Sequence, residues 1–354
     1  MMSASMPPTG GFGFTSAGMP LAPLGALPAV IGGVACAAVG DDRVYVGTTD
    51  GALVCCHAAP ASATPGACAA AGEIEWRLGR RLPLGIGRRR VEQLELVPTF
   101  GMLLVLADGA VGVHDAETLE RRGTLEQSKG AGAFCVSPAA SGAAACRVCV
   151  ALRRGKPLRL VLYELGALPA PSAAAAPAGM LSAIAPMRAM PGWAPFKTLL
   201  TPEPPLALAW GAEQICVGYA AEYALVHDAS GEVVELLGNE PPAPPLILAL
   251  GARAGQASAD GHEELLIVTG AVGTFVDLAH ATAAARSPIA WDDAPRALAH
   301  VGPFILALLP ASIDVHLLGD ASMPHARVQR LPPPPRAHGA VSYTHLTLPT
   351  KRIV

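Results

Sequence analysis

One phrase recurs six times along this chain: a short run rich in Val, Leu and Ile, a tight turn of small or polar residues, and a second apolar run. The copies occupy residues 43–56, 102–115, 147–165, 214–228, 264–278 and 304–318. Asp50-Gly51 and Asp108-Gly109 are the strongest turn signals, because glycine adopts positive φ without steric cost and Asp-Gly suits tight hairpin turns. The pattern predicts six β-hairpins.

The spacing of these hairpins predicts a β-propeller. Successive turns lie about 40 to 66 residues apart, which suits four-stranded blades joined by loops of variable length. A single blade leaves both faces of its sheet uncovered, so the blades must stack radially around an axis. We expect an all-β fold with about seven WD40-like blades, the seventh being assembled from residues 134–136 or from both ends of the chain.

Low-complexity segments divide the 354 residues. Residues 1–28 carry no charge and predict a disordered leader. We assign residues 29–331 to the propeller, with an Ala- and Pro-rich loop at 166–195 inserted between blades. Residues 332–354 begin with a proline run that cannot donate to a sheet ladder. They end in VSYTHLTLPTKRIV, which resembles the translated read-through of an adaptor, so we expect a non-native tail on a protein that continues beyond Ala340.

Composition disfavours membrane-spanning and nucleic-acid-binding proteins. Hydrophobic residues make up 51% of the chain, but Pro, Gly or charge interrupts each long apolar stretch before the ~20 residues that a spanning helix needs. The formal net charge is −3, so no overall basic field attracts nucleic acid. No basic residue precedes the apolar stretch at 27–39, as a secretory signal requires. We therefore expect a cytoplasmic protein.

The cysteines and histidines do not form a predicted site. Cys146 and Cys149 have C-x-x-C spacing, but an offset of three in a strand places the two sulfurs on opposite faces, and no second ligand pair occurs. His114, His227 and His316 recur near the ends of hairpins, which indicates a repeat feature that satisfies backbone groups at a blade corner. We predict no metal, no cofactor and no catalytic residue, and therefore no enzyme.

Two charged motifs remain. Asp292 and Asp293 are predicted to cap a loop between blades. Six arginines fall within fourteen residues with no acidic residue between them: Arg77, Arg80, Arg81, Arg88, Arg89 and Arg90. They are interpreted either as a solvated loop before the strand at Val91 or as an interaction loop for anionic lipid or an acidic partner. Near a membrane each basic residue contributes roughly 1 kcal/mol.

Four segments carry a family resemblance: YVGTTDG (45–51), VEQLELVPTFGMLLVLADG (91–109), ICVGYAAEYALVHDASGEVVELL (215–237) and SPIAWDDAPRALAHVGPFILALLPASIDVHLL (287–318). Together they resemble the citron homology (CNH) domain. Within that group they are similar to the vacuolar-sorting and TGF-β-receptor-associated subunits of the HOPS and CORVET tethering complexes.

The resemblance implies a non-enzymatic propeller at the N-terminus of an endosomal or vacuolar tethering subunit, which an α-helical solenoid follows in the family. The implied partners are other subunits of the tethering complex and Rab-type GTPases, and the implied location is peripheral, at endosomal or vacuolar membranes. CNH domains also occur in kinases and exchange factors. The alternative is therefore a regulatory propeller of a small-GTPase signalling protein.

Overall fold

The fold is described from a computed structural model. It covers residues 31, 33–40, 42–60, 74–85, 89–137, 146–165, 193, 195–211, 213–239, 243–250, 263–301, 303–318 and 325–332. Within these ranges the regular structure consists of β-strands and a short 3-10 turn at Pro98–Phe100, with no α-helix. Accordingly, no described helix has the length and apolar character needed to cross a membrane. The all-β prediction is confirmed.

The strands form six sheets, named here blades 1 to 6 in chain order. Blade 1 contains β1 (Val34–Val39), β2 (Arg43–Thr48), β3 (Ala52–Pro60) and β4 (Ile74–Pro83). Blade 2 contains β5 (Val91–Val97), β6 (Met102–Ala107), β7 (Ala110–Asp115) and β8 (Arg121–Thr124). Blade 3 contains β9 (Ala131–Val136), β10 (Cys146–Leu152), β11 (Arg159–Leu165) and β12 (Pro195–Leu200).

Blade 4 contains β13 (Ala207–Trp210), β14 (Gln214–Gly218), β15 (Glu222–His227) and β16 (Val233–Gly238). Blade 5 contains β17 (Leu246–Ala249), β18 (Glu264–Thr269), β19 (Val272–Asp277) and β20 (Thr282–Ala283), and β21 (Ile289–Ala290) also pairs with β19. Blade 6 contains β22 (Ala297–Val301), β23 (Phe304–Leu308), β24 (Ile313–Leu317) and β25 (Ala326–Leu331).

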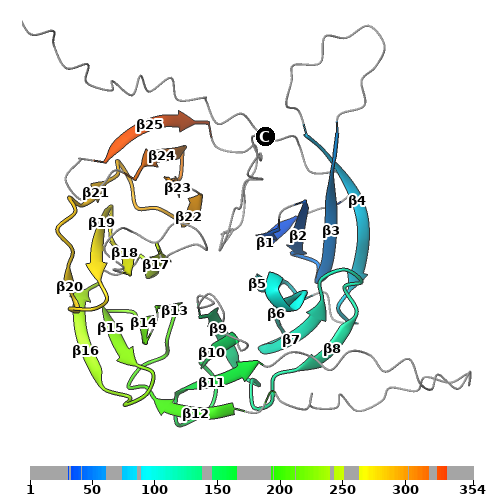
Figure 1. Cartoon of the computed structure of the whole chain (residues 1–354), viewed down its shortest axis with the longest axis horizontal. Helices are drawn as coiled ribbons and strands as arrows, with labels where there is room; N and C mark the ends of the chain where they lie inside the picture. Colours follow the sequence, from blue (N-terminus) through cyan, green and yellow to red (C-terminus); the bar gives the residue numbers. More distant parts are fainter. Residues whose placement is uncertain are drawn as a thin grey trace, which may run out of the picture.

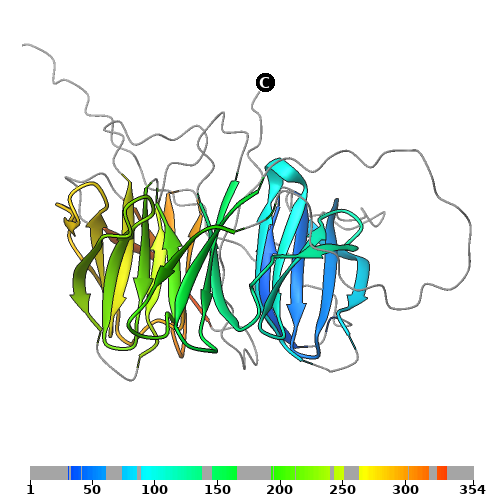
Figure 2. The same ribbon diagram turned by 90° about the horizontal axis from the view of Figure 1, so that it is seen from below.

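The six sheets stand in a ring, with the first strand of each blade nearest the centre and the last at the rim (Figure 1). Seen from the side, the strands run roughly along the axis of this ring (Figure 2). Neighbouring strands of every sheet pair antiparallel. The arrangement is a β-propeller, which confirms the predicted architecture.

Each of the six predicted hairpins forms the second and third strands of one blade. The described residues make six blades, so the expected number of about seven is one too high. Residues 134–136, which were considered for a seventh blade, belong to β9 at the inner edge of blade 3. The hairpin pattern missed this role because residues 137–145, rather than a tight turn, join β9 to β10.

Turn chemistry accounts for the two Asp-Gly signals. Asp108 and Gly109 join β6 to β7 with φ values of 54° and 67°, and two successive positive φ angles match the twist of the flanking strands. Gly51 has φ +84°, and a Cβ atom there would come within 2.5 Å of the Arg89 carbonyl oxygen. Position 51 therefore accepts glycine and excludes any residue that carries a Cβ atom.

Apolar side chains fill the space between consecutive blades. Separate buried clusters lie between blades 1 and 2, 2 and 3, 3 and 4, 4 and 5, and 5 and 6, and a sixth covers the face of blade 1 turned away from blade 2. Cys146 belongs to the cluster between blades 2 and 3, and Cys149 to the cluster between blades 3 and 4. Their predicted placement on opposite faces is confirmed.

The Ala- and Pro-rich tract joins β11 to β12, which are neighbours in one sheet. It is therefore inserted within blade 3, not between blades as expected. Its final residues belong to the blade, because Trp193 is buried in the core and β12 begins at Pro195. The predicted leader at 1–28, residues 166–192 of the tract and the tail at 333–354 lie outside the described residues.

Candidate functional site

The six clustered arginines are not all in a loop. Arg77, Arg80 and Arg81 lie on β4, the rim strand of blade 1, whereas Arg89 and Arg90 directly precede β5; Arg88 lies outside the described residues. The loop interpretation was wrong for the first three because a rim strand is exposed to solvent and lacks the apolar run that marks an inner strand. We name Arg77, Arg80, Arg81, Arg89 and Arg90 the arginine surface.

A β-bulge at Gly79 brings two of these arginines onto one face of the sheet. Arg80 stands opposite Cys55 and Arg77 stands opposite His57, with the register shifting between the two pairs. Directly opposed residues share a face, and Cys55 and His57 are two residues apart on β3. A spacing of three would otherwise separate Arg77 from Arg80, so the bulge gathers their positive charge.

One contact of the arginine surface links blade 1 to blade 2, and two ion pairs lie within a single blade or at its edge. Arg80 donates from NH1 to the Thr118 carbonyl oxygen at 3.4 Å, and Arg89 Nε lies 3.2 Å from Asp108 Oδ1. Arg81 NH2 lies 2.8 Å from Asp50 Oδ2. All these side chains are solvent-exposed, and exposed ion pairs contribute only about 0 to 1 kcal/mol each. Rearrangement of these pairs to meet a partner would therefore cost little.

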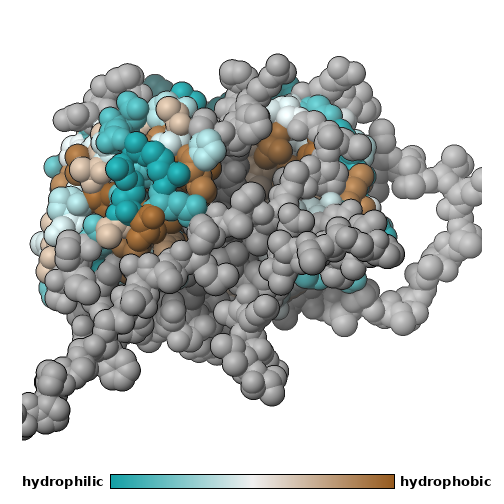
Figure 3. Space-filling model, turned by 90° about the horizontal axis from the view of Figure 1, so that it is seen from above, coloured by the Kyte–Doolittle hydropathy of each residue, from teal (hydrophilic) through white to brown (hydrophobic). Residues whose placement is uncertain are grey.

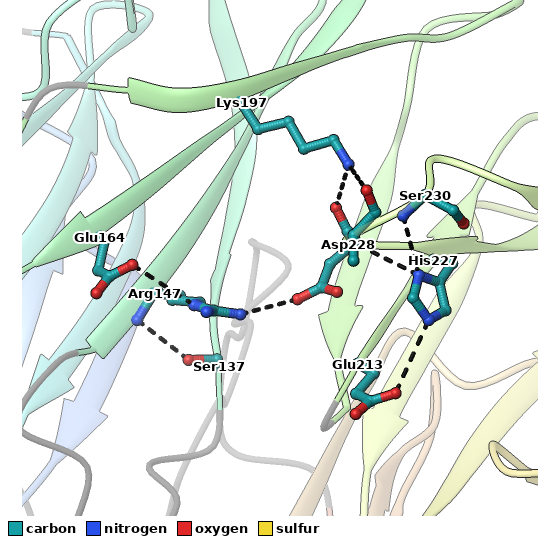
Figure 4. A network of polar contacts seen from close by, with 9 residues as sticks. Ser137, Arg147, Glu164, Lys197, Glu213, His227, Asp228 and Ser230 are labelled. Carbon is teal, nitrogen blue, oxygen red and sulfur yellow. Dashed lines mark hydrogen bonds and ion pairs between the residues drawn. The ribbon is translucent and has the colours of Figure 1, made fainter.

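A polar network ties blade 3 to blade 4 (Figure 4). The Asp228 carboxylate, 8% exposed, accepts from Arg147 NH1 at 3.1 Å. Lys197 of β12 donates to the Asp228 carbonyl oxygen at 2.6 Å, and Arg147 Nε lies 3.9 Å from Glu164 Oε2. We name this network the blade 3–4 clamp. It joins two blades through groups that satisfy one another.

The repeated histidines cap turns in two of the three cases. His114 Nδ1 lies 2.9 Å from the Leu119 carbonyl oxygen, and His227 Nδ1 accepts from the backbone N–H groups of Ala229 and Ser230 at 3.2 and 3.1 Å. The blade-corner prediction is confirmed for these two. It is wrong for His316, whose Nε2 is buried without a hydrogen-bond partner in the described structure.

Asp292 lies between blades 5 and 6, as predicted, but forms ion pairs there. Its carboxylate pairs with Arg330 and lies 3.7 Å from Arg327, both on β25. Asp314 of β24 is fully buried and accepts from Arg330 Nε at 2.7 Å. The acidic pair predicted from sequence therefore contributes one carboxylate to a charged group that holds the rim strand of blade 6.

The described cysteines are buried free thiols. Burial raises the pKa of Cys146 to about 12 and that of Cys55 to about 11, so both remain protonated at neutral pH. In the part of the chain that the structure describes, no three or more His, Cys, Asp or Glu side chains form a group able to hold a metal ion.

Sequence reasoning did not bring His316 and His325 together. These two residues line one cavity between β21 and the outer strands of blade 6. They lie on different elements, and their spacing matches no motif with a known ligand. Only the packing of blade 5 against blade 6 shows that they share a site.

Comparison with known proteins identifies the family. A model described as the CNH domain matches residues 40–326. The Vam6/Vps39-like protein of Mus musculus is 25% identical over 233 residues, which is 65% of this chain and 22% of that protein. Vacuolar sorting protein 39 of Arabidopsis thaliana is 29% identical over 117 residues, 33% of this chain and 11% of that protein.

The fold is shared with a solved CNH structure. The AfRom2 CNH domain superposes with a TM-score of 0.50 at 17% identity and covers 84% of each chain. The matched part of this chain spans only 22% of the length of the mouse relative. The family model covers most of the propeller, and the chain therefore belongs to the CNH domain family.

Proposed function

We propose that this propeller is the N-terminal domain of a membrane-tethering subunit in vesicle-mediated protein transport. The observation that carries the proposal is the similarity to the Vam6/Vps39-like protein over 65% of this chain. A second relative is named for vacuolar sorting. In this proposal the propeller works without catalysis, at the surface of endosomal or vacuolar membranes, by contacting other tethering subunits and Rab-type GTPases.

The arginine surface supports a role in contact with an acidic partner or an anionic membrane. Its exposed guanidinium groups lie along the rim of blade 1 and beside β5, and the Gly79 bulge concentrates two of them. In a chain of net charge −3, such a local concentration of positive charge attracts anionic surfaces over about a Debye length, 8 to 10 Å at physiological salt.

Affinity purification of the native full-length protein from cells tests the tethering role. We expect other tethering-complex subunits to co-purify, and a Rab-type GTPase to bind preferentially in its GTP-loaded form. Sequencing the full-length transcript shows which other domains the same reading frame encodes. A kinase or exchange-factor domain in that reading frame, without tethering subunits in the purified material, would favour the signalling alternative instead.

Liposome co-sedimentation tests the arginine surface separately. The variant combines Arg77→Ser with Arg80→Ser, and the control combines Arg154→Ser with Lys156→Ser, two exposed basic residues near the β10–β11 turn. Both variants lose two positive charges, so only position distinguishes them. We expect the first variant alone to lose binding to anionic vesicles. Equal binding by all three proteins, or none by any, would contradict the lipid interpretation and leave an acidic protein partner to be tested by pull-down.

A further inference from the structure

A cavity of about 470 Å³ lies where blade 5 meets blade 6. Residues 287–290, which lead into and include β21, line one side, and His316, His325 and Arg327 line the other. On the side of the molecule where β25 lies, the surface is hydrophilic with hydrophobic patches beside it (Figure 3). The volume falls within the range of about 300 to 1,000 Å³ that small-ligand sites occupy.

The two histidines have ring nitrogens without hydrogen-bond partners. His316 is only 6% exposed, yet its buried Nε2 has no partner among the described residues. Neither ring nitrogen of His325 has one. The Ser287 backbone lies near enough to influence the pKa of His325 but not in hydrogen-bonding geometry. Since a buried polar group without a hydrogen-bond partner is destabilising, these nitrogens favour a ligand that supplies the missing partner.

Aromatic neighbours fix the positions of both imidazoles. Trp291 meets the His316 ring edge-on, with ring centroids 6.0 Å apart. Phe275 packs against the His325 ring at 4.7 Å. Both aromatic side chains are buried in the core between blades 5 and 6. The polar atoms of the cavity are therefore held by a rigid apolar layer, as binding sites require.

The charged groups that face His316 are already matched with one another. They are Asp314, Arg327, Arg330 and the neighbouring His325. Asp314 accepts from Arg330 at 2.7 Å and lies 3.4 Å from Arg327 NH1. Arg327 is 47% exposed, so part of its guanidinium remains available to a ligand.

The charged groups that face His325 are likewise paired. Arg286 and Glu264 are the two, and Arg286 Nε donates to Glu264 Oε2 at 2.6 Å. Asp292 also pairs with Arg330 and lies 3.7 Å from Arg327. With this carboxylate counted and both imidazoles neutral, the acidic and basic side chains around the cavity balance. Any net charge within it therefore comes from protonation of His316 and His325.

We propose that this cavity binds an oxyanion, a carboxylate or phosphate group, through His316, His325 and Arg327. The N–H groups of these side chains donate to anionic oxygen, and charge-assisted bonds of this kind are the stronger class. A metal cation would be repelled by Arg327. The site does not depend on the tethering role, because it follows from the geometry of the cavity alone.

Binding is coupled to protonation of the histidines. Burial lowers the pKa of both His316 and His325, so their imidazoles are mainly neutral at pH 7 in the absence of ligand. A bound anion stabilises the imidazolium form and raises these pKa values. Affinity must then increase as pH falls from 7.5 to 6, because the anion binds the protonated form more tightly.

Histidine-selective NMR of the full chain tests the site, with inorganic phosphate and acetate as separate probes. We expect saturable shifts of the His316 and His325 resonances with either probe. Acetate keeps its charge between pH 7.5 and pH 6, whereas phosphate gains a proton, so the pH dependence is measured with acetate, and we expect it to bind roughly fivefold more tightly at pH 6 than at pH 7.5. Tighter binding of phosphate than of acetate would identify a phosphate-bearing ligand, and the reverse order a carboxylate. Either order supports the oxyanion site.

Substitutions of cavity residues test whether the bound anion occupies this cavity. His316→Asn and, separately, Arg327→Gln should each weaken binding about tenfold, since each removes one donor. His280→Gln, an exposed histidine after β19, is the matched control and should bind like the wild type. If His316→Asn fails to fold, the half-exposed Arg327 variant carries the test. The proposal is overturned if phosphate and acetate cause no saturable shift, or if the Arg327→Gln variant binds as tightly as the control.

Discussion

At the junction of blades 3 and 4, the side chains of Arg147, Glu164 and Lys197 and the Asp228 residue contact polar partners across or along the blades (Figure 4). At the junction of blades 5 and 6, two imidazoles lie beside a cavity with ring nitrogens that have no partner in the described residues. Both junctions rest on a buried apolar cluster. Polar groups at the first are therefore structural, whereas those at the second are arranged for a ligand.

The largest effect on stability should come from acidification, which protonates a carboxylate whose hydrogen bonds stabilise the folded state. The side chain of Asp115, the last residue of β7, is 14% exposed. Burial alone would raise its pKa, but hydrogen bonds from Thr118 and Arg122 lower the pKa from the ordinary 3.8 to about 2. Because the folded-state pKa is the lower one, its stabilisation is present above pH 4 and is lost between pH 4 and pH 2, about 2 kcal/mol in total.

Urea unfolding of the wild type and of Asp115→Asn at a series of pH values measures this contribution. We expect the two free energies of unfolding to converge as pH falls toward 2. A constant difference between them from pH 5 to pH 2 would show that the Asp115 carboxylate is not held by these bonds.

Loss of the blade 3–4 clamp should have the next largest effect. Asp228→Ala removes the buried partner of Arg147 and should lower the free energy of unfolding by about 1 to 2 kcal/mol. The loss is limited because Arg147 is 45% exposed and regains water. Arg89→Ala removes an exposed pair with Asp108 and should change stability by no more than about 0.5 kcal/mol. Equal losses in the two variants would remove the distinction between clamp and surface pair.

Substitution at the blade 5–6 cavity should have the smallest effect on stability. His316→Phe keeps a ring against Trp291 and removes an unsatisfied nitrogen, so the free energy of unfolding should change by less than about 0.5 kcal/mol or rise slightly. Chemical denaturation at pH 7.5 without added phosphate makes this comparison. A loss as large as that for Asp228→Ala would indicate that His316 is structural.

The sequence predicts the two middle strands of each blade and fails at the rim. Hairpins such as β6–β7 were predicted because an Asp-Gly turn between apolar runs is a local signal. The rim strand β4 was interpreted as loop, and β12 was not predicted as a strand, because solvent on their surfaces removes the apolar pattern. The insertion was placed between blades for the same reason, since β12 was not recognised as a strand.

The candidate sites depended on tertiary contacts to different degrees. The arginines were visible as a charge run, but the Gly79 bulge that aligns Arg77 with Arg80 was not, because it depends on pairing with β3. His316 occupies the same repeat position as His114 and His227. Its different role, beside a cavity rather than at a turn, is visible only from the packing of blade 5 against blade 6. No local pattern could show that His325 completes the same cavity.

Hydrogen exchange monitored by mass spectrometry, with and without phosphate at pH 6, tests most directly whether the two junctions differ. We expect slower exchange in β21, β24 and β25 when phosphate is present, and unchanged exchange in β10 and β15 at the blade 3–4 clamp. Protection at both junctions, or at neither, would contradict the assignment of a ligand to one and a structural role to the other.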